Sequence, residues 1–139
     1  MKYFLFLFIA FTSFLFSNSK EEKIFYIDNL RVLENPTMNS PSYIPKDFIP
    51  EQAQFNKYFE LDSFSIEAGL FIQTNLSKED LIIFYETSFK KNDWRIFRKD
   101  IQKDSIVYQV ENVSKRVISI IIRNVGPVSM IKLFYKRSR

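Results

Sequence analysis

Two arrangements of side chains in this sequence have residue types and a spacing that could support catalysis. Glu60 and Asp62 lie two positions apart in a run that predicts a strand, so both carboxylates would point to one face. Two carboxylates about 5 to 9.5 Å apart are what hydrolysis of a glycosidic bond requires. Ser88 and Lys91 match the letters of a Ser-x-x-Lys nucleophile motif. Solvated strands and helix ends carry the same residue types, so we interpret both arrangements as surface residues and predict no catalytic residue.

The residue types that are missing exclude most other chemistry. The chain has no His and no Cys, which excludes a Ser-His-Asp triad, a Cys nucleophile, and His- or thiolate-based metal sites. It has only two glycines, Gly69 and Gly126, too few for a glycine-rich phosphate loop. We therefore expect a protein that is not an enzyme and that holds no cofactor or metal.

The first nineteen residues have the three parts of a secretory signal. Lys2 is followed by an uncharged, mostly apolar run from Tyr3 to Phe16, and Ser17 and Ser19 occupy the small-residue positions of a cleavage site before Lys20. As a helix this run would span about 21 Å, less than the roughly 30 Å of a bilayer core. We predict a signal peptide at 1–19 and a periplasmic or secreted protein. The alternative is an uncleaved signal, which would be the protein's only membrane contact.

The rest of the sequence divides into a leader and one domain. Residues 20–54 are predicted to form a leader and a Pro-rich linker, and residues 55–139 a single α+β domain. Lys20–Glu34 fits either an edge strand or an unstructured leader. Asn35–Pro50 contains four prolines and is predicted to lie extended over the domain, pinned by Phe48 and Ile49.

The domain has the pattern of a curved antiparallel sheet with one helix across one face, in the order β-β-α-β-β-β-β. Tyr58–Ile66 and Leu70–Asn75 are predicted to form a hairpin with its turn at Glu67–Gly69, where Gly69 would supply a positive φ. Alternating apolar and polar residues after the helix indicate half-buried strands. The four predicted strands are Trp94–Lys99, Ser105–Val113, Val117–Asn124 and Val128–Lys136.

The helix between these groups has clear local signals. Ser77 is a good N-cap with Asp80 at the capping-box spacing, and Asn92-Asp93 is expected to end the helix. Trp94, which follows, is expected in the core, and the hydroxyl of Tyr85 is expected at a polar rim. We predict that one face of the helix and Trp94 are buried against the sheet. The helix residues are Leu81, Ile82, Tyr85 and Phe89, and the sheet residues are Ile106, Tyr108, Ile118, Ile120 and Leu133.

The segment from Ser77 through Tyr85 to Trp94, together with the Pro-rich run from Ile44 to Pro50, resembles part of a group of small exported bacterial domains. In that group a helix of the form S-x-E-E-hydrophobic-x-x-F-Y ends in G-W and leads into a hairpin. The resemblance covers roughly residues 44–98 and departs at Asp93, where the group usually has Gly. It implies an exported α+β domain and carries over no functional residue.

One face of the predicted sheet has the pattern of a partner surface. If Ile118, Ile120 and Ile122 face the helix, their neighbours Val117 and Ile121 face away from it. Apolar residues that gather on such a face, with a basic rim, indicate a contact surface for an acidic partner. The predicted surface consists of Val107, Val117, Ile121, Arg123, Lys132, Phe134 and Lys136.

These patterns predict a non-enzymatic envelope protein that binds another envelope protein or an anionic envelope component. Without Lys2 the net charge is +3 (19 basic minus 16 acidic residues), which is too small to indicate nucleic-acid binding. Two alternatives remain open. The domain could carry a small apolar ligand between helix and sheet, as its many Phe and Tyr residues would allow, or the Lys20–Glu34 leader could cover the proposed surface.

The signal sequence leads to the first testable prediction. The mature protein should begin at or near Lys20, because Ser17 and Ser19 are the best-placed small residues for the signal peptidase. N-terminal sequencing of the protein from its own host measures this directly. A membrane-bound form that retains Met1 would contradict cleavage and favour the anchor.

Overall fold

The structure is a computed structural model that describes residues 21, 23–27, 30–34, 43–62 and 65–138. The predicted signal peptide, its cleavage site and residues 35–42 of the Pro-rich linker lie outside the described residues. The elements in chain order are β1 (Lys23–Ile27), β2 (Leu30–Glu34), the 3-10 helix η1 (Lys46–Phe48), β3 (Gln54–Asp62), β4 (Ser65–Thr74), α2 (Lys78–Lys91), β5 (Arg95–Ile101), β6 (Ser105–Glu111), β7 (Val117–Val125) and β8 (Val128–Ser138).

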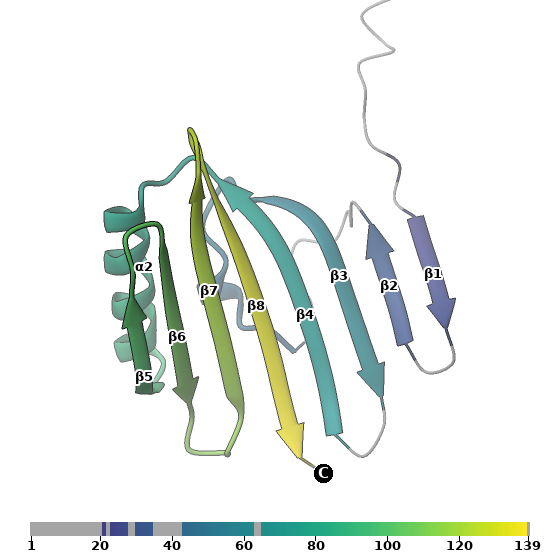
Figure 1. Cartoon of the computed structure of the whole chain (residues 1–139). Coiled ribbons are helices and arrows are strands. Elements are labelled where there is room, and N and C mark those ends of the chain that lie inside the picture. The colour runs from purple at the N-terminus through teal and green to yellow at the C-terminus, as the bar shows by residue number, and fades with distance from the viewer. Residues whose placement is uncertain (1–20, 22, 28–29, 35–42, 63–64, 139) are drawn as a thin grey trace, which may run out of the picture.

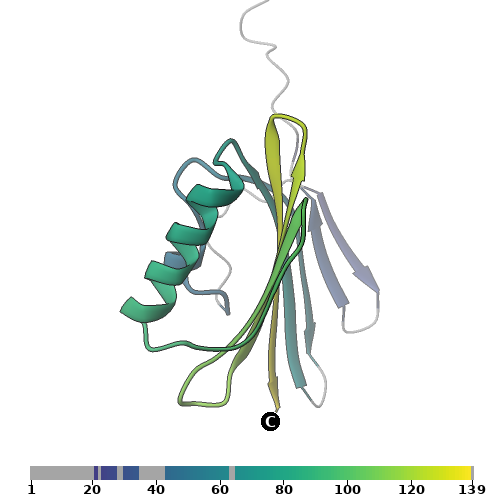
Figure 2. The ribbon, with the colours of Figure 1, turned by 60° about the vertical axis from the view of Figure 1, so that its left-hand side comes forward.

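Within the described residues, the eight strands form a single antiparallel sheet with α2 on one face (Figures 1 and 2). The spatial order is β1-β2-β3-β4-β8-β7-β6-β5, so the last strand of the chain is inserted between β4 and β7. This confirms an α+β architecture in which an antiparallel sheet carries a helix. The expected number of strands is wrong, because β1 and β2 precede the expected series and extend the sheet beyond β3.

The ends of α2 are set by the local signals in the sequence. The backbone N–H of Asp80 donates to the Ser77 hydroxyl oxygen at 3.1 Å, and that hydroxyl donates to the Asp80 carboxylate at 2.8 Å. At the other end the Asn92 N–H donates to the Ser88 carbonyl, and Asp93 adopts a φ of 57°. Both predicted ends are confirmed, and Asp93 takes the left-handed conformation that more often requires glycine.

The core lies between α2 and the sheet. Leu81, Tyr85 and Phe89 from the helix are buried, as is Trp94 just after it, whereas Ile82 is half-buried. The Phe89 ring centroid lies 5.4 Å from that of Tyr108 in the sheet. The predicted core is therefore confirmed except at Ile82. The buried apolar side chains of β6, β7 and β8 are Ile106, Tyr108, Val110, Ile118, Ile120, Ile122, Ile131, Leu133 and Tyr135.

The described part of the Pro-rich segment packs on the same face as the helix (Figure 2). Phe48 is fully buried, and its ring centroid lies 5.3 Å from that of Phe89 and 5.2 Å from that of Trp94. Tyr43 stacks on Tyr135 at 5.6 Å. The expected pinning by Phe48 is confirmed, and the half-buried Ile49 also packs against the core. Residues 43–50 therefore complete the cover of the sheet that α2 begins.

The predicted turn at Glu67–Gly69 is wrong. β4 begins at Ser65, so these three residues lie inside a strand, and the chain reverses between Asp62 and Ser65. Gly69 has no positive φ, which among the described glycines occurs at Gly126 alone. Gly69 instead marks a position in β4 where a side chain approaches the strand closely.

Two tyrosines between α2 and the sheet, Tyr108 on β6 and Tyr85 on α2, have contrasting environments. The Tyr108 hydroxyl donates to the Glu86 carboxylate at 2.9 Å, and Lys99 donates to the same oxygen at 2.6 Å. The hydrogen bond from Lys99 holds the pKa of Glu86 below its ordinary value. The expectation that the Tyr85 hydroxyl reaches a polar rim is wrong, because it is buried with no hydrogen-bond partner among the described residues. Its burial raises the pKa of Tyr85 well above the ordinary range.

The packing around Phe89 predicts a large loss of stability on truncation. Phe89→Ala should lower the free energy of unfolding by about 3–5 kcal/mol, because a cavity would open among rings that have no room to collapse. A denaturant melt measures the change. Ile83→Ala is the matched control, since Ile83 is on the same helix with 67% of its surface exposed, and it should change little. A loss below about 1 kcal/mol for Phe89→Ala would contradict this account of the core.

Candidate functional site

All seven residues of the predicted partner surface lie on the face of the sheet opposite α2, which we call the outer face. Side chains alternate along each strand, and the neighbours of these residues are the buried ones that face α2. The pairing places Val107 beside Ile121 and Ile121 beside Lys132, which forms one row across three strands. Val117 pairs with Lys136, and Phe134 lies between these two rows. The structure therefore brings the predicted residues together.

No described element covers the outer face. In Figure 1 the strands pass in front of α2 and of the segment that contains η1, and Figure 2 places both on one side of the sheet. The described part of the leader forms β1 and β2, which pair edge to edge with β3. The alternative in which the Lys20–Glu34 leader covers this face is therefore wrong for its described residues. A strand that can pair with a sheet edge satisfies its backbone there, whereas lying across the face would not.

Three phenylalanines form the aromatic centre of the outer face. Phe59, Phe71 and Phe134 are half-buried, and their ring centroids lie 5.9 to 6.3 Å apart. Sequence analysis predicted Phe134 alone. Phe71 alternates with the inward-facing Leu70 and Ile72, a signal that was present in the sequence. Phe59 joins the cluster because it pairs with Gly69 of β4. The predicted turn at Glu67–Gly69 did not allow this pairing.

Gly69 explains how the Phe59 ring fits. Phe59, Gly69 and Phe134 form one register row across β3, β4 and β8. A Cβ atom built on Gly69 would overlap the Phe59 ring, so the ring occupies the space that any other residue would need. The absent side chain lets the ring lie against the strand beside Phe134. This close approach is the reason for a glycine inside β4.

Charge is distributed unevenly over the outer face. At one end Lys136 pairs with Glu67 at 3.5 Å, and Glu111 pairs with Arg95 at 3.0 Å. The hydrogen bond from Arg95 lowers the pKa of Glu111, which keeps this carboxylate ionised. At the other end Lys132 makes no ion pair among the described residues, and its Nζ lies 5.4 Å from the centroid of the Phe71 ring. The basic residues of the predicted surface are therefore not equivalent.

Arg123 and Lys132 flank a shallow hollow of about 350 Å³ in the outer face. Its apolar floor comes from Ile121, Val125 and Met130. Arg123 is exposed and, like Lys132, has no acidic partner among the described residues. The hollow therefore presents two uncompensated cations beside apolar side chains, an arrangement that suits an acidic surface with its own apolar groups.

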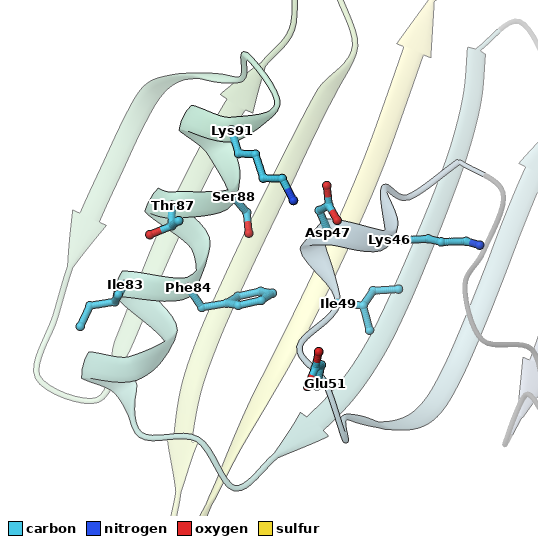
Figure 3. Close-up of a pocket in the computed structure, with 9 residues that line it drawn as sticks. All are labelled: Lys46, Asp47, Ile49, Glu51, Ile83, Phe84, Thr87, Ser88 and Lys91. Atoms are coloured by element: carbon cyan, nitrogen blue, oxygen red, sulfur yellow. The ribbon is translucent and has the colours of Figure 1, made fainter.

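A second concave region lies between η1 and α2, with a volume of about 530 Å³. Figure 3 shows the Phe84 ring pointing from α2 toward Ile49, and Lys91 extending toward Asp47. Its lining includes two basic and two acidic residues, so it has no preferred charge. The lining residues are Lys46, Asp47, Ile49, Glu51, Ile83, Phe84, Thr87, Ser88 and Lys91.

Ser88 and Lys91 lie on α2, and Glu60 lies on β3. Ser88 and Lys91 both line the groove of Figure 3, but no hydrogen bond between their side chains is found in the described residues. Glu60 accepts a hydrogen bond from the Tyr58 hydroxyl at 3.1 Å on the inward face. The side chain of Asp62 lies outside the described ones. Burial, followed by the Glu60 charge, raises the pKa of Tyr58 above its ordinary range.

Among the described residues, no three acidic side chains gather in a way that could bind a metal ion. No helix in the described part of the chain has the length and apolarity needed to cross a bilayer. The chain matches no protein-family model, no curated protein and no solved structure.

The close packing of Phe59 on Gly69 predicts that Gly69→Ala changes the stability in opposite directions with and without the Phe59 ring. Gly69→Ala should destabilise the protein by about 1–3 kcal/mol, because the added methyl group displaces the ring from its neighbours. In a Phe59→Ala background the same change should be neutral or stabilising by up to about 1 kcal/mol, since alanine is otherwise preferred over glycine in a strand. Urea unfolding of the four proteins measures the coupling.

The control for this cycle is Gly126→Ala. Gly126 has a φ of 63° and no atom near its missing Cβ, so its substitution is costly for the backbone alone. That cost should be the same with and without Phe59. Equal effects of Gly69→Ala in both backgrounds would contradict the packing described for the outer face.

Proposed function

We propose that this protein is a non-enzymatic, exported binding module of the bacterial envelope, and that its outer face contacts another envelope protein. The observation that carries the proposal is an uncovered sheet face whose centre is aromatic and aliphatic rather than polar. An antiparallel sheet with one solvated face usually alternates apolar and polar residues. Here Phe59, Phe71, Phe134 and Ile121 alternate with buried neighbours along their strands and therefore project from the solvent side instead. Contiguous apolar groups of this kind are typical of contact surfaces.

The charges on the outer face support a partner of stated chemistry. Lys136 is neutralised locally by Glu67, so the attraction for an acidic partner rests on Arg123 and Lys132. Both flank the apolar side chain of Ile121. We therefore propose a partner with an apolar contact surrounded by carboxylates. Attraction between the charges would speed association, and apolar contact would hold the complex.

The packing between helix and sheet favours this proposal over a carrier of small apolar ligands. A carrier needs a cavity between the two layers. In this protein the rings of Phe48, Tyr85, Phe89 and Tyr108 contact one another there at centroid distances of 5.3 to 5.9 Å. Three hollows of the described residues lie elsewhere, two on the outer face and one beside η1. A filled core together with an exposed patch is what an adaptor requires.

The test is capture of the partner from an envelope extract by the immobilised protein, followed by measurement of the dissociation constant with the purified partner. Ile121→Asp should abolish capture, because it places a charge in the apolar contact. Lys132→Glu should raise the dissociation constant about five- to tenfold at low salt, with a smaller effect at high salt where charges are screened.

Two matched variants control this test. Lys136→Glu makes the same charge change on the same strand, but at a cation that already has an acidic partner, so its effect should be smaller than that of Lys132→Glu. Ile83→Asp places a charge on an exposed apolar residue on the helix side and should leave binding unchanged. Capture that is equal for the wild type and Ile121→Asp, or no captured partner at all, would overturn the proposal.

A further inference from the structure

The two edges of the sheet are protected to very different degrees. β5 forms one edge, and four of its seven residues are charged: Arg95, Arg98, Lys99 and Asp100. Its pairing with β6 also shifts register between Ile96 and Arg98, which marks a bulge. Charged side chains and bulges are the devices by which proteins prevent other strands from pairing with an exposed edge. The β5 edge is therefore protected.

β1 forms the other edge, and its pairing has no bulge. Its sequence is Lys23-Ile-Phe-Tyr-Ile27, with a single charge at its beginning, and its pairing with β2 is regular over all five residues. Ile24 is 46% exposed and Tyr26 is 70% exposed. A regular, apolar edge strand of this kind is an open template for strand addition.

The backbone of β1 is oriented for such an addition. Ile27 pairs with Leu30 across two intervening residues, the spacing at which the closing pair of a hairpin is hydrogen-bonded. Hydrogen-bonded pairs alternate along antiparallel strands, so Ile24 and Tyr26 direct their N–H and C=O groups away from β2. The two exposed side chains also share one face of the sheet, because they are two positions apart.

We propose that the β1 edge pairs with β1 of a second copy of this chain, antiparallel and about a two-fold axis at Phe25. In this register Ile24 of each copy lies opposite Tyr26 of the other. The backbone groups that face outward then satisfy one another in two reciprocal pairs. The exposed side chains form two aromatic–β-branched cross-strand pairs, a favourable combination. Lys23 lies opposite Ile27, so the two positive charges are kept apart.

The pairing of Ile24 with Tyr26 in both directions favours a second copy of this chain over an unrelated strand as the partner. A two-fold contact requires one surface to complement itself, and in this register the exposed Ile24 and Tyr26 of one β1 strand meet the exposed Tyr26 and Ile24 of the other. The contact is also small, since two strands of five residues bury much less than the roughly 1,600 Å² of a standard interface. The proposal is therefore of a weak dimer that forms with rising concentration, and a covalent trap is the suitable probe.

The natural chain has no cysteine, so each engineered cysteine is unique. Phe25→Cys places the two cysteines opposite each other, with Cα atoms about 4.5 to 5.5 Å apart, within the range that a disulfide spans. Ile24→Cys is the matched control, because its two copies are offset by two positions and lie roughly 8 Å apart. After mild oxidation of the chain purified from the envelope, Phe25→Cys should give at least fivefold more disulfide dimer on a non-reducing gel.

Two further measurements keep the proposal falsifiable. An equal mixture of the Ile24→Cys and Tyr26→Cys chains should form a mixed disulfide that neither forms alone, because these positions face each other only across the two-fold axis. In the cysteine-free chain, Tyr26→Lys should weaken concentration-dependent dimerisation in sedimentation equilibrium at least tenfold and leave the unfolding midpoint unchanged.

Three results would overturn the proposal. These are equal dimer yields from Phe25→Cys and Ile24→Cys, stronger dimer formation by an Arg98→Cys variant at the β5 edge, and a wild-type chain that stays monomeric at millimolar concentration. Because β1 lies at the far edge of the sheet from the hollow at Arg123 and Lys132, these outcomes are independent of the partner proposed for the outer face.

Discussion

The packing of aromatic rings around Phe89 holds the two layers of this domain together. Its ring contacts Phe48 from the Pro-rich segment, Tyr85 from the same helix and Tyr108 from the sheet. One side chain thus joins parts of the chain that are far apart in sequence. The chain has no cysteine with which to form a disulfide, so its stability depends on buried apolar area, and large aromatic side chains supply the most of it per residue.

This arrangement has a consequence for the rest of the sheet. Among the described residues a single α-helix and the short segment at 43–50 cover the inner face, and both lie on the same side. The outer face is left to the strands themselves. Its centre is nevertheless apolar, where the rings of Phe59, Phe71 and Phe134 contact one another. The uncovered face therefore presents residue types that are typical of a contact surface.

The insertion of β8 between β4 and β7 determines which rings form the aromatic cluster and which basic side chains of the outer face have an acidic partner. It places Phe134 beside Gly69 and next to the ring of Phe59, and it places Lys132 beside Phe71. It also brings Lys136 to Glu67, so one basic residue of the C-terminal strand is neutralised. The net charge of the chain predicts a mildly basic surface. Strand register determines which cations on that surface remain available to a partner.

The sequence by itself determined the features that depend on neighbours in the chain. The hydroxyl of Ser77 and the break at Asn92 set the ends of α2, and the alternation in β6, β7 and β8 identified which side chains face the helix, because caps and strand periodicity are local. Only the tertiary structure decided why Gly69 is a glycine, since the ring that excludes a side chain there comes from Phe59 on another strand. It likewise buried the Tyr85 hydroxyl and placed β1 and β2 in the sheet. These outcomes depend on strand pairing and on packing between distant segments, and no local pattern of residues contains that information.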